Sequence, residues 1–128
     1  MTQKYFKDLI VWQKSMDLAV MTYKVLPLLP KGELYALSDQ IRRSVISIPS
    51  NIAEGQQRNS DKDFLRFLHI AKGSLGELET QIILCQRLGF LQQKEIDPLF
   101  SQIIEVGRLL NGLINNITLI GRQSANGS

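Results

Sequence analysis

The chain has 128 residues, of which 44% are hydrophobic and 21% charged, a composition that excludes a disordered chain and fits one globular domain. Its longest uninterrupted apolar run is four residues, which excludes a membrane span of about 20 residues and a signal peptide. The single cysteine, Cys85, has no partner for an intrachain disulfide. We therefore expect a cytoplasmic protein that does not contact a membrane.

The net charge of +3 is concentrated in one segment of the chain. Between Gln40 and Lys72 there are six basic and three acidic residues, whereas the rest of the chain has nine of each. Such an excess is either an ordinary solvated surface or an anion-binding surface, and the charge pattern leaves both open. The basic residues are Arg42, Arg43, Arg58, Lys62, Arg66 and Lys72.

The first two predicted helices carry apolar or small residues at alternating spacings of three and four, the seam of helices packed side by side. The first ends at Pro27 and Pro30, because proline lacks the N–H needed for the next helical hydrogen bond. The second follows the short linker 31–33. The expected seams are Leu9, Trp12, Met16, Ala19, Tyr23 and Leu26, and then Leu34, Leu37, Ile41, Val45, Ile48 and Ile52.

The second helix contains the segment Ser47-Ile-Pro-Ser-Asn-Ile-Ala-Glu-Gly55, which places a proline inside a helical pattern. Pro49 costs about 3 kcal/mol in a helix interior, but the apolar seam continues on both sides of it. We therefore expect a kink at Pro49 rather than a stop. Ser47 and Asn51 are short polar residues able to satisfy the freed backbone groups, and Glu54 can pair with Arg58. The alternative is a ligand site at the kink.

The third and fourth predicted helices have clear ends. Ser60 is an N-cap followed by carboxylates in the first turn, and Gly89 closes the third helix. The fourth begins near Asp97-Pro98 and ends at Gly121. The seams are Phe64, Leu68, Ala71, Leu75, Leu78, Ile82 and Cys85, and then Leu99, Ile103, Val106, Leu110, Leu113, Ile117 and Ile120.

Four helices joined by short links, with no strand-like alternation, predict an all-α fold: an antiparallel up-down-up-down four-helix bundle with helix two kinked at Pro49. The single domain should cover residues 1–121, with residues 122–128 forming a flexible C-terminal tail.

Several apolar residues lie off these seams and would be a liability if exposed together, so we expect burial between subunits. The alternative is a broad single-chain core with a few exposed apolar residues. The off-seam residues are Val11, Ile46, Phe67, Ile70, Ile83, Leu84, Ile104 and Ile114.

Gly73 and Gly76 lie on one helical stripe with His69 and Thr80, and each glycine costs about 1 kcal/mol in a helix interior. Close approach of another backbone, from the same chain or a neighbour, would offset that cost.

Catalytic and metal-binding arrangements are not evident. The sole histidine and the sole cysteine, His69 and Cys85, are 16 residues apart on one predicted helix, or about 24 Å. No glutamate has a histidine three residues later, as the di-metal bundles require, and too few Cys and His residues exist for a zinc site. We expect no enzymatic activity, no cofactor and no metal.

The motifs, taken together, resemble a four-helix-bundle family that includes proteins encoded in intervening sequences of bacterial large-subunit ribosomal RNA genes. The accessory variability protein of diversity-generating retroelements is a related member. The resemblance covers Phe6 to about Ile120 and implies a non-enzymatic homopentamer. In the retroelement system the related protein associates with a reverse transcriptase and nucleic acid. The resemblance rests on the segments 6–13, 33–37, 40–44, 47–55 and 67–80, and on Arg58.

Three functions follow as hypotheses. The first is a non-catalytic homo-oligomer, expected to be a pentamer, whose basic residues contact RNA, DNA or a nucleic-acid-bound protein such as a reverse transcriptase. Because exposed aromatic residues are not evident in the sequence, we do not expect this binding to read specific bases. The second is a scaffold or adaptor that binds a protein partner and no nucleic acid. The third, a helical endoribonuclease, is disfavoured. Such enzymes pair an arginine with a histidine that follows it after four to six intervening residues, and the matching positions before His69 are Phe64, Asp63 and Lys62.

Overall fold

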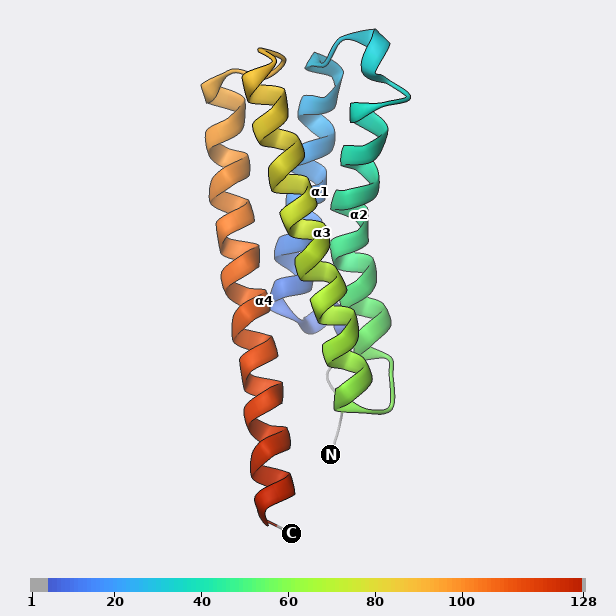
Figure 1. Cartoon of the computed structure of the whole chain (residues 1–128), viewed down its shortest axis with the longest axis vertical. Coiled ribbons are helices and arrows are strands. Elements are labelled where there is room, and N and C mark those ends of the chain that lie inside the picture. Colours follow the sequence, from blue (N-terminus) through green and yellow to red (C-terminus); the bar gives the residue numbers. More distant parts are fainter. Residues whose placement is uncertain (1–4, 128) are drawn as a thin grey trace.

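The computed structural model describes residues 5–127, and this part of the chain contains four α-helices and no strand. The predicted all-α four-helix fold is confirmed. Figure 1 shows the α1–α2 and α3–α4 connections at one end and the α2–α3 connection at the other, so successive helices run in opposite directions. The elements are η1 (Phe6–Asp8), α1 (Ile10–Val25), η2 (Leu26–Leu28), η3 (Lys31–Glu33), α2 (Leu37–Gln56), α3 (Asp61–Arg87) and α4 (Gln93–Gly127).

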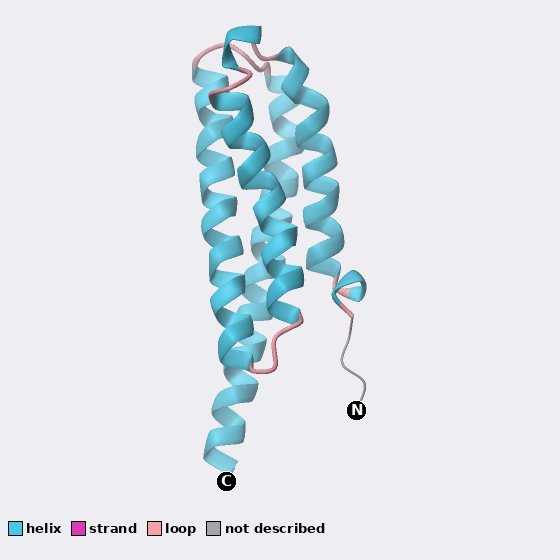
Figure 2. Cartoon of the chain, turned by 90° about the vertical axis from the view of Figure 1, so that its right-hand side faces the viewer, coloured by secondary structure: helices cyan, strands magenta, loops and turns pink. Residues whose placement is uncertain are grey.

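Each helix packs against two neighbours around one core: α1 and α3 both contact α2 and α4. The contact between α2 and α3 is the most extensive. The side view in Figure 2 shows an elongated bundle in which α4 extends past the other helices at the end that carries the C-terminus. The largest side chains with less than 2% of their surface exposed come from all four helices and include Leu18, Ile41, Ile48, Leu68, Leu78, Ile82 and Leu110.

Local signals define the ends of α3 as predicted. The Ser60 hydroxyl accepts a hydrogen bond from the backbone N–H of Asp63 at 3.1 Å, which satisfies one of the free donors at the start of the helix. Gly89, with φ at +78°, adopts the left-handed conformation that follows a helix end and that other residues rarely adopt. The N-cap and the closing glycine are confirmed.

Two other helix ends differ from the prediction. The segment 31–36 forms a 3₁₀ turn and a further turn, so α2 begins at Leu37 and Leu34 remains 44% exposed. The Glu33 carboxylate accepts a hydrogen bond from the Leu37 N–H at 3.4 Å and takes the place of an N-cap side chain. At the other end of the chain, Gly121 does not stop α4, because one glycine costs only about 1 kcal/mol in a helix and no proline follows. The flexibility expected of residues 122–128 stays a prediction.

The seams of α2, α3 and α4 lie largely where they were predicted, but that of α1 does not. The α1 residues that face the core are Val11, Ser15, Leu18 and Thr22. The sequence pattern missed this stripe because two of its positions are polar. The Ser15 hydroxyl donates to the Trp12 carbonyl at 2.8 Å, whereas the Thr22 hydroxyl has no hydrogen-bond partner among the described atoms. Most of the predicted first seam therefore lies beside the core: Met16 and Tyr23 remain 40% and 41% exposed, whereas Leu26 at its end is buried as predicted.

Pro49 lies inside an unbroken α2, so the helix continues through it as predicted. The amide of Asn51 donates hydrogen bonds to the Ser47 carbonyl at 2.8 Å and to the Ser47 hydroxyl at 2.9 Å. The carbonyl that loses its donor because of Pro49 is that of Val45, four residues earlier, so these bonds do not satisfy it, and its satisfaction by a short polar side chain stays a prediction. The predicted ion pair of Glu54 with Arg58 is present at 2.7 Å. The bend at Pro49 stays a prediction.

The glycines have different roles. A Cβ placed on Gly55 would lie 2.6 Å from the Phe67 Cβ and 3.3 Å from the Phe64 carbonyl oxygen, so only glycine lets α2 and α3 approach this closely. A Cβ on Gly73 or Gly76 would meet nothing within 4 Å. The expectation that a helix of the same chain packs against these two glycines is wrong, because that face of α3 is open. Contact with a neighbouring chain stays a prediction.

Part of α4 resembles a membrane span by length and composition. Gln93–Ile120 is the one described helix that meets both criteria. This is weak evidence, because the core helix of a helical bundle has the same properties. Ile96, Leu99, Val106 and Leu110 of α4 are indeed buried against the other helices.

We predict that Gly55→Ala lowers the free energy of unfolding by about 1–3 kcal/mol, the usual cost of overpacking, because the new methyl meets a side-chain Cβ that can shift only with the α3 backbone. Chemical denaturation at one protein concentration measures this. Gly112→Ala on α4 is the matched control, since nothing lies within 4 Å of its new Cβ, and it should leave stability unchanged or raise it by up to about 1 kcal/mol. Equal effects of the two substitutions would contradict the close approach.

A second prediction concerns Cys85, which is fully buried as its seam position indicated. Burial, with a smaller contribution from the charge of Glu33, raises the pKa of its thiol from 9.0 to about 11. The folded state therefore holds this proton more tightly than the unfolded state. The resulting stabilisation is complete below pH 9 and is lost as the pH rises toward 11.

Denaturation of the wild type and Cys85→Ala at pH 7 and pH 10.5 isolates the thiol, because lysine and tyrosine titrations are common to both proteins. The wild type should lose on the order of 2 kcal/mol more than the variant between these pH values. Equal losses would show that the thiol ionises as easily in the folded protein as in the unfolded one.

Candidate nucleic-acid interface

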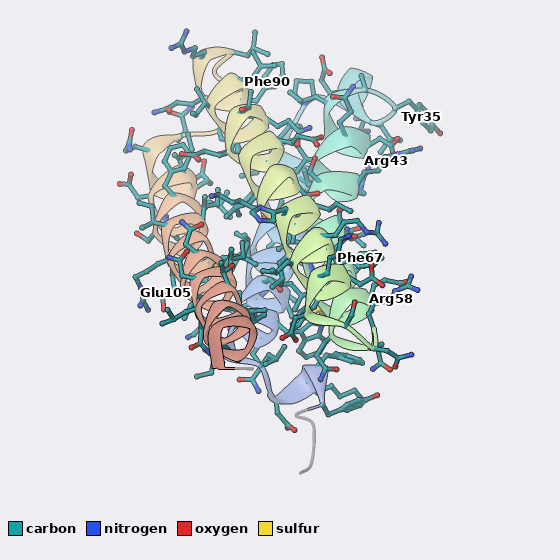
Figure 3. All side chains as sticks on the ribbon, turned by 60° about the horizontal axis from the view of Figure 1, so that its bottom comes forward. Tyr35, Arg43, Arg58, Phe67, Phe90 and Glu105 are labelled. Carbon is teal, nitrogen blue, oxygen red and sulfur yellow. The ribbon has the colours of Figure 1, made fainter. Side chains whose placement is uncertain are left out.

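The six basic residues predicted to bind nucleic acid do not form one patch. Arg42 and Arg43 lie in the first half of α2, whereas Arg58 directly follows α2 and the others lie on α3. Fifteen positions separate Arg43 from Arg58, which corresponds to about 20 Å at 1.5 Å per helical residue. Figure 3 shows Arg58 beside Phe67 near the α2–α3 turn, and Arg43 and Tyr35 toward the other end of α2.

The structure brings two of the six together on one aromatic ring, and we call Arg58, Arg66 and Phe67 the paired-arginine site. The guanidinium carbons of Arg58 and Arg66 lie 4.9 Å and 4.5 Å from the Phe67 ring centroid, within the range of a cation–π contact. The Phe67 ring is buried, while both arginine side chains remain accessible, with 43% and 58% exposure. Two exposed cations thus contact the same aromatic ring.

Packing of α2 against α3 creates this site. Gly55 lets the Phe67 Cβ approach the α2 backbone, and the Phe67 ring is then within reach of Arg58, just after α2, and of Arg66, its neighbour on α3. Each arginine also has a carboxylate on its own segment: Glu54 at 2.7 Å from Arg58 and Asp63 at 3.9 Å from Arg66. These exposed pairs contribute little to stability and leave guanidinium donors free for an anion.

The other predicted basic residues have different surroundings. Lys62 is exposed one turn before Arg66 on α3 and extends the paired-arginine site, while Lys72 is exposed further along the same helix. Arg43 is 80% exposed and pairs with Asp39 at 3.1 Å. Arg42 is half-buried at the edge of a hollow between α1 and α2.

A polar cleft of about 350 Å³ lies between α2 and α3. The Ser47 and Ser74 hydroxyls are 2.8 Å apart across it, and the Gln81 side-chain oxygen is buried with no hydrogen-bond partner among the described residues. The sequence analysis identified only Arg43 and Ser47 among the lining residues, because the others are uncharged or acidic and nothing in the sequence marked them as site residues, even where they lie in the segments that carry the resemblance. The full lining is Gln40, Arg43, Ser44, Ser47, Ser74, Glu77 and Gln81.

Exposed aromatic residues are present, contrary to the sequence-based expectation. Tyr35 is 91% exposed in the turn before α2, and Tyr5 and Tyr23 are each more than 40% exposed. The prediction failed because Tyr35 lies in a segment expected to be helical and Tyr23 lies on a stripe expected to be core. The surface therefore offers aromatic faces for base stacking.

An apolar groove follows the outer face of α1 and α2, and we call it the α1–α2 groove. One hollow of about 340 Å³ is lined by Trp12, Met16, Ala19, Ile46, Pro49, Ser50 and Ala53. Ala19 also lines a second hollow, and Tyr23 connects that hollow to a third of about 600 Å³ next to Pro27 and Leu34. The seam predicted for the first helix thus lines a groove on the surface instead of the core.

No site for catalysis or metal binding emerges from the described residues. They include no group of three or more His, Cys, Asp or Glu side chains able to hold a metal ion. His69 is exposed on α3, while Cys85 is buried further along the same helix, so the two side chains do not meet.

Comparisons with known proteins identify the family and agree with the helical fold. No curated protein matches the chain. A crystal structure of a protein of unknown function from the S23 ribosomal protein family of Bacteroides thetaiotaomicron is similar, with a TM-score of 0.76 and 29% sequence identity over 82% of this chain and 98% of that one. The 23S rRNA-intervening sequence protein family matches residues 7–112. Because this match covers most of a chain that forms a helical bundle, the protein belongs to the 23S rRNA-intervening sequence protein family.

Proposed function

We propose that the protein is a non-catalytic, self-associating, cytoplasmic module that binds RNA through phosphate contacts. The observation that carries this proposal is the paired-arginine site, where Arg58 and Arg66 are held on the ring of Phe67. Both guanidinium groups are exposed and keep N–H donors free, so each can donate hydrogen bonds to a phosphate of an RNA strand that passes Phe67. Lys62 adds a third cation one turn away.

Self-association is the second part of the proposal. Ile46, Ile70, Ile83, Leu84 and Ile104 are all at least 36% exposed in the single chain, and the α1–α2 groove is lined mainly by apolar groups. Burial of these groups between copies removes them from water. The resemblance to the intervening-sequence and accessory variability proteins indicates a pentamer, in which five chains of charge +3 would carry +15. Repeated phosphate contacts around such a ring would raise a weak affinity through multivalency.

A second candidate function is a scaffold that binds another protein without touching nucleic acid. The α1–α2 groove favours it, since an apolar groove lined at helical spacing by Trp12, Met16, Ala19 and Tyr23 suits an amphipathic helix. Under this alternative the arginines are ordinary solvated charges. A partner protein that co-purifies after nuclease treatment, with no RNA affinity in the purified chain, would favour the scaffold. A reverse transcriptase is the partner to test first.

We predict that the double variant Arg58→Gln with Arg66→Gln binds a single-stranded RNA oligonucleotide more weakly than the wild type does. The slope of log affinity against log salt concentration should also become shallower, by about 0.7 for each phosphate that the variant no longer neutralises. Fluorescence anisotropy over a salt series measures both quantities. Arg108→Gln is the matched control, because Arg108 is a 67% exposed arginine that pairs with Glu105 on α4, outside the paired-arginine site. Binding that is undetectable at low salt in the wild type, or weakened equally in the control, would contradict the proposal.

A further prediction tests self-association. Met16→Glu places a charge in the α1–α2 groove, and we expect the mass measured by light scattering to fall toward that of one 14.5 kDa chain while the helix content is retained. Asn59→Glu in the exposed α2–α3 turn adds the same charge outside the groove and should leave the mass unchanged. A monomeric wild type at micromolar concentration would refute self-association.

A further inference from the structure

The polar cleft between α2 and α3 contains buried hydroxyl groups that have no role in the phosphate contacts proposed above. Ser44 and Ser74 are buried polar residues, with 5% and 7% exposure, and both line the cleft. Side chains buried at a helix–helix contact are usually apolar, so hydroxyls there require hydrogen-bond partners. The cleft also lies on the same pair of helices as the paired-arginine site.

The hydrogen bonds in the cleft leave specific groups unused. The Asn51 amide donates to the Ser47 hydroxyl at 2.9 Å, and the Ser47 hydroxyl is 2.8 Å from that of Ser74. The Ser47 oxygen can accept from both Asn51 and Ser74, or Ser47 can donate to Ser74, and in either direction one hydroxyl proton of this pair stays free. The Ser44 hydroxyl makes no hydrogen bond among the described residues.

Gln81 supplies the complementary group. Its side-chain oxygen is buried and has no donor among the described residues, which costs about 1–3 kcal/mol unless a ligand or water satisfies it. The cleft therefore presents free hydroxyl donors together with an acceptor that needs a donor. A ligand hydroxyl, which both donates and accepts, matches this combination.

Positive charge lies within the cleft and beyond one of its ends. Arg43 lines the cleft between Gln40 and Ser47 on α2, and Arg58 and Arg66 lie about 20 Å further along the same two helices, beyond Asn51. This length corresponds to about six nucleotides of a stacked strand at ~3.4 Å each. The carboxylate of Glu77, which also lines the cleft, disfavours a phosphate inside it but accepts hydrogen bonds from hydroxyl or amino groups.

We propose that a single strand of RNA lies along the outer face of α2 and α3, with phosphates at Arg43 and at the paired-arginine site and with ribose 2′-hydroxyl groups over the polar cleft. This inference rests on the proposed RNA binding and adds the part of the ligand that is recognised. The 2′-hydroxyl is the group that distinguishes RNA from DNA. The cleft thus makes the surface selective for RNA without reading its bases.

The test compares RNA and DNA oligonucleotides of the same sequence, binding to the full chain at low salt, by fluorescence anisotropy. We expect the wild type to bind RNA about five- to tenfold more tightly, the effect of one or two hydrogen bonds. Ser44→Ala with Gln81→Met should reduce this preference to less than about twofold while leaving DNA affinity unchanged. Ser101→Ala, at an exposed serine on α4, is the control and should keep the preference.

A second measurement does not depend on the folding of a variant. RNA carrying 2′-deoxy substitutions at its central nucleotides should bind the wild type as DNA does. Equal affinity of the wild type for RNA and DNA, or an unchanged preference in the double variant, would overturn the role of the cleft and leave phosphate binding intact. Absence of binding to either nucleic acid would overturn both proposals.

Discussion

The contact between Gly55 on α2 and Phe67 on α3 is the interaction on which the candidate site depends. No side chain other than hydrogen fits at Gly55, because a Cβ there would lie 2.6 Å from the Phe67 Cβ. This close approach places the Phe67 ring where Arg58 and Arg66 both reach it. The same pair of helices forms the polar cleft further along, so both candidate surfaces lie on the α2–α3 packing.

The bundle has two outer faces of different chemistry. The α2–α3 face combines guanidinium groups, hydroxyls and an unsatisfied amide oxygen, whereas the α1–α2 face is lined mainly by apolar side chains. A polar face suits a solvated, charged ligand, and an apolar face suits another protein surface. Because α2 contributes to both, the proline-containing helix connects the two activities that we propose. In a symmetric assembly every copy would present the same polar face.

The sequence predicted the four helices because the spacing of apolar residues along a helix follows the face that is buried in the core. The seams of α2 to α4 were identified since nearly all their core positions are apolar, and Ser60 and Gly89 were identified since their chemistry is specific to helix ends. The α1 seam was missed because Ser15 and Thr22 occupy core positions while the larger Trp12, Met16 and Tyr23 lie beside them. A pattern of hydrophobicity cannot distinguish the core of a chain from a groove on its surface.

The candidate site was only partly predictable for a related reason. Charge identified Arg58 and Arg66, but their meeting on Phe67 depends on how α2 crosses α3, and the uncharged Ser44, Ser74 and Gln81 carry no signal in one sequence. The central claim is that the paired arginines contact phosphate, and side-chain NMR of the arginine Nε–H groups tests it directly. During titration with a short single-stranded RNA, the Arg58 and Arg66 signals should shift first while that of Arg108 stays in place. Shifts that are uniform over all arginines, or absent from these two, would contradict the claim.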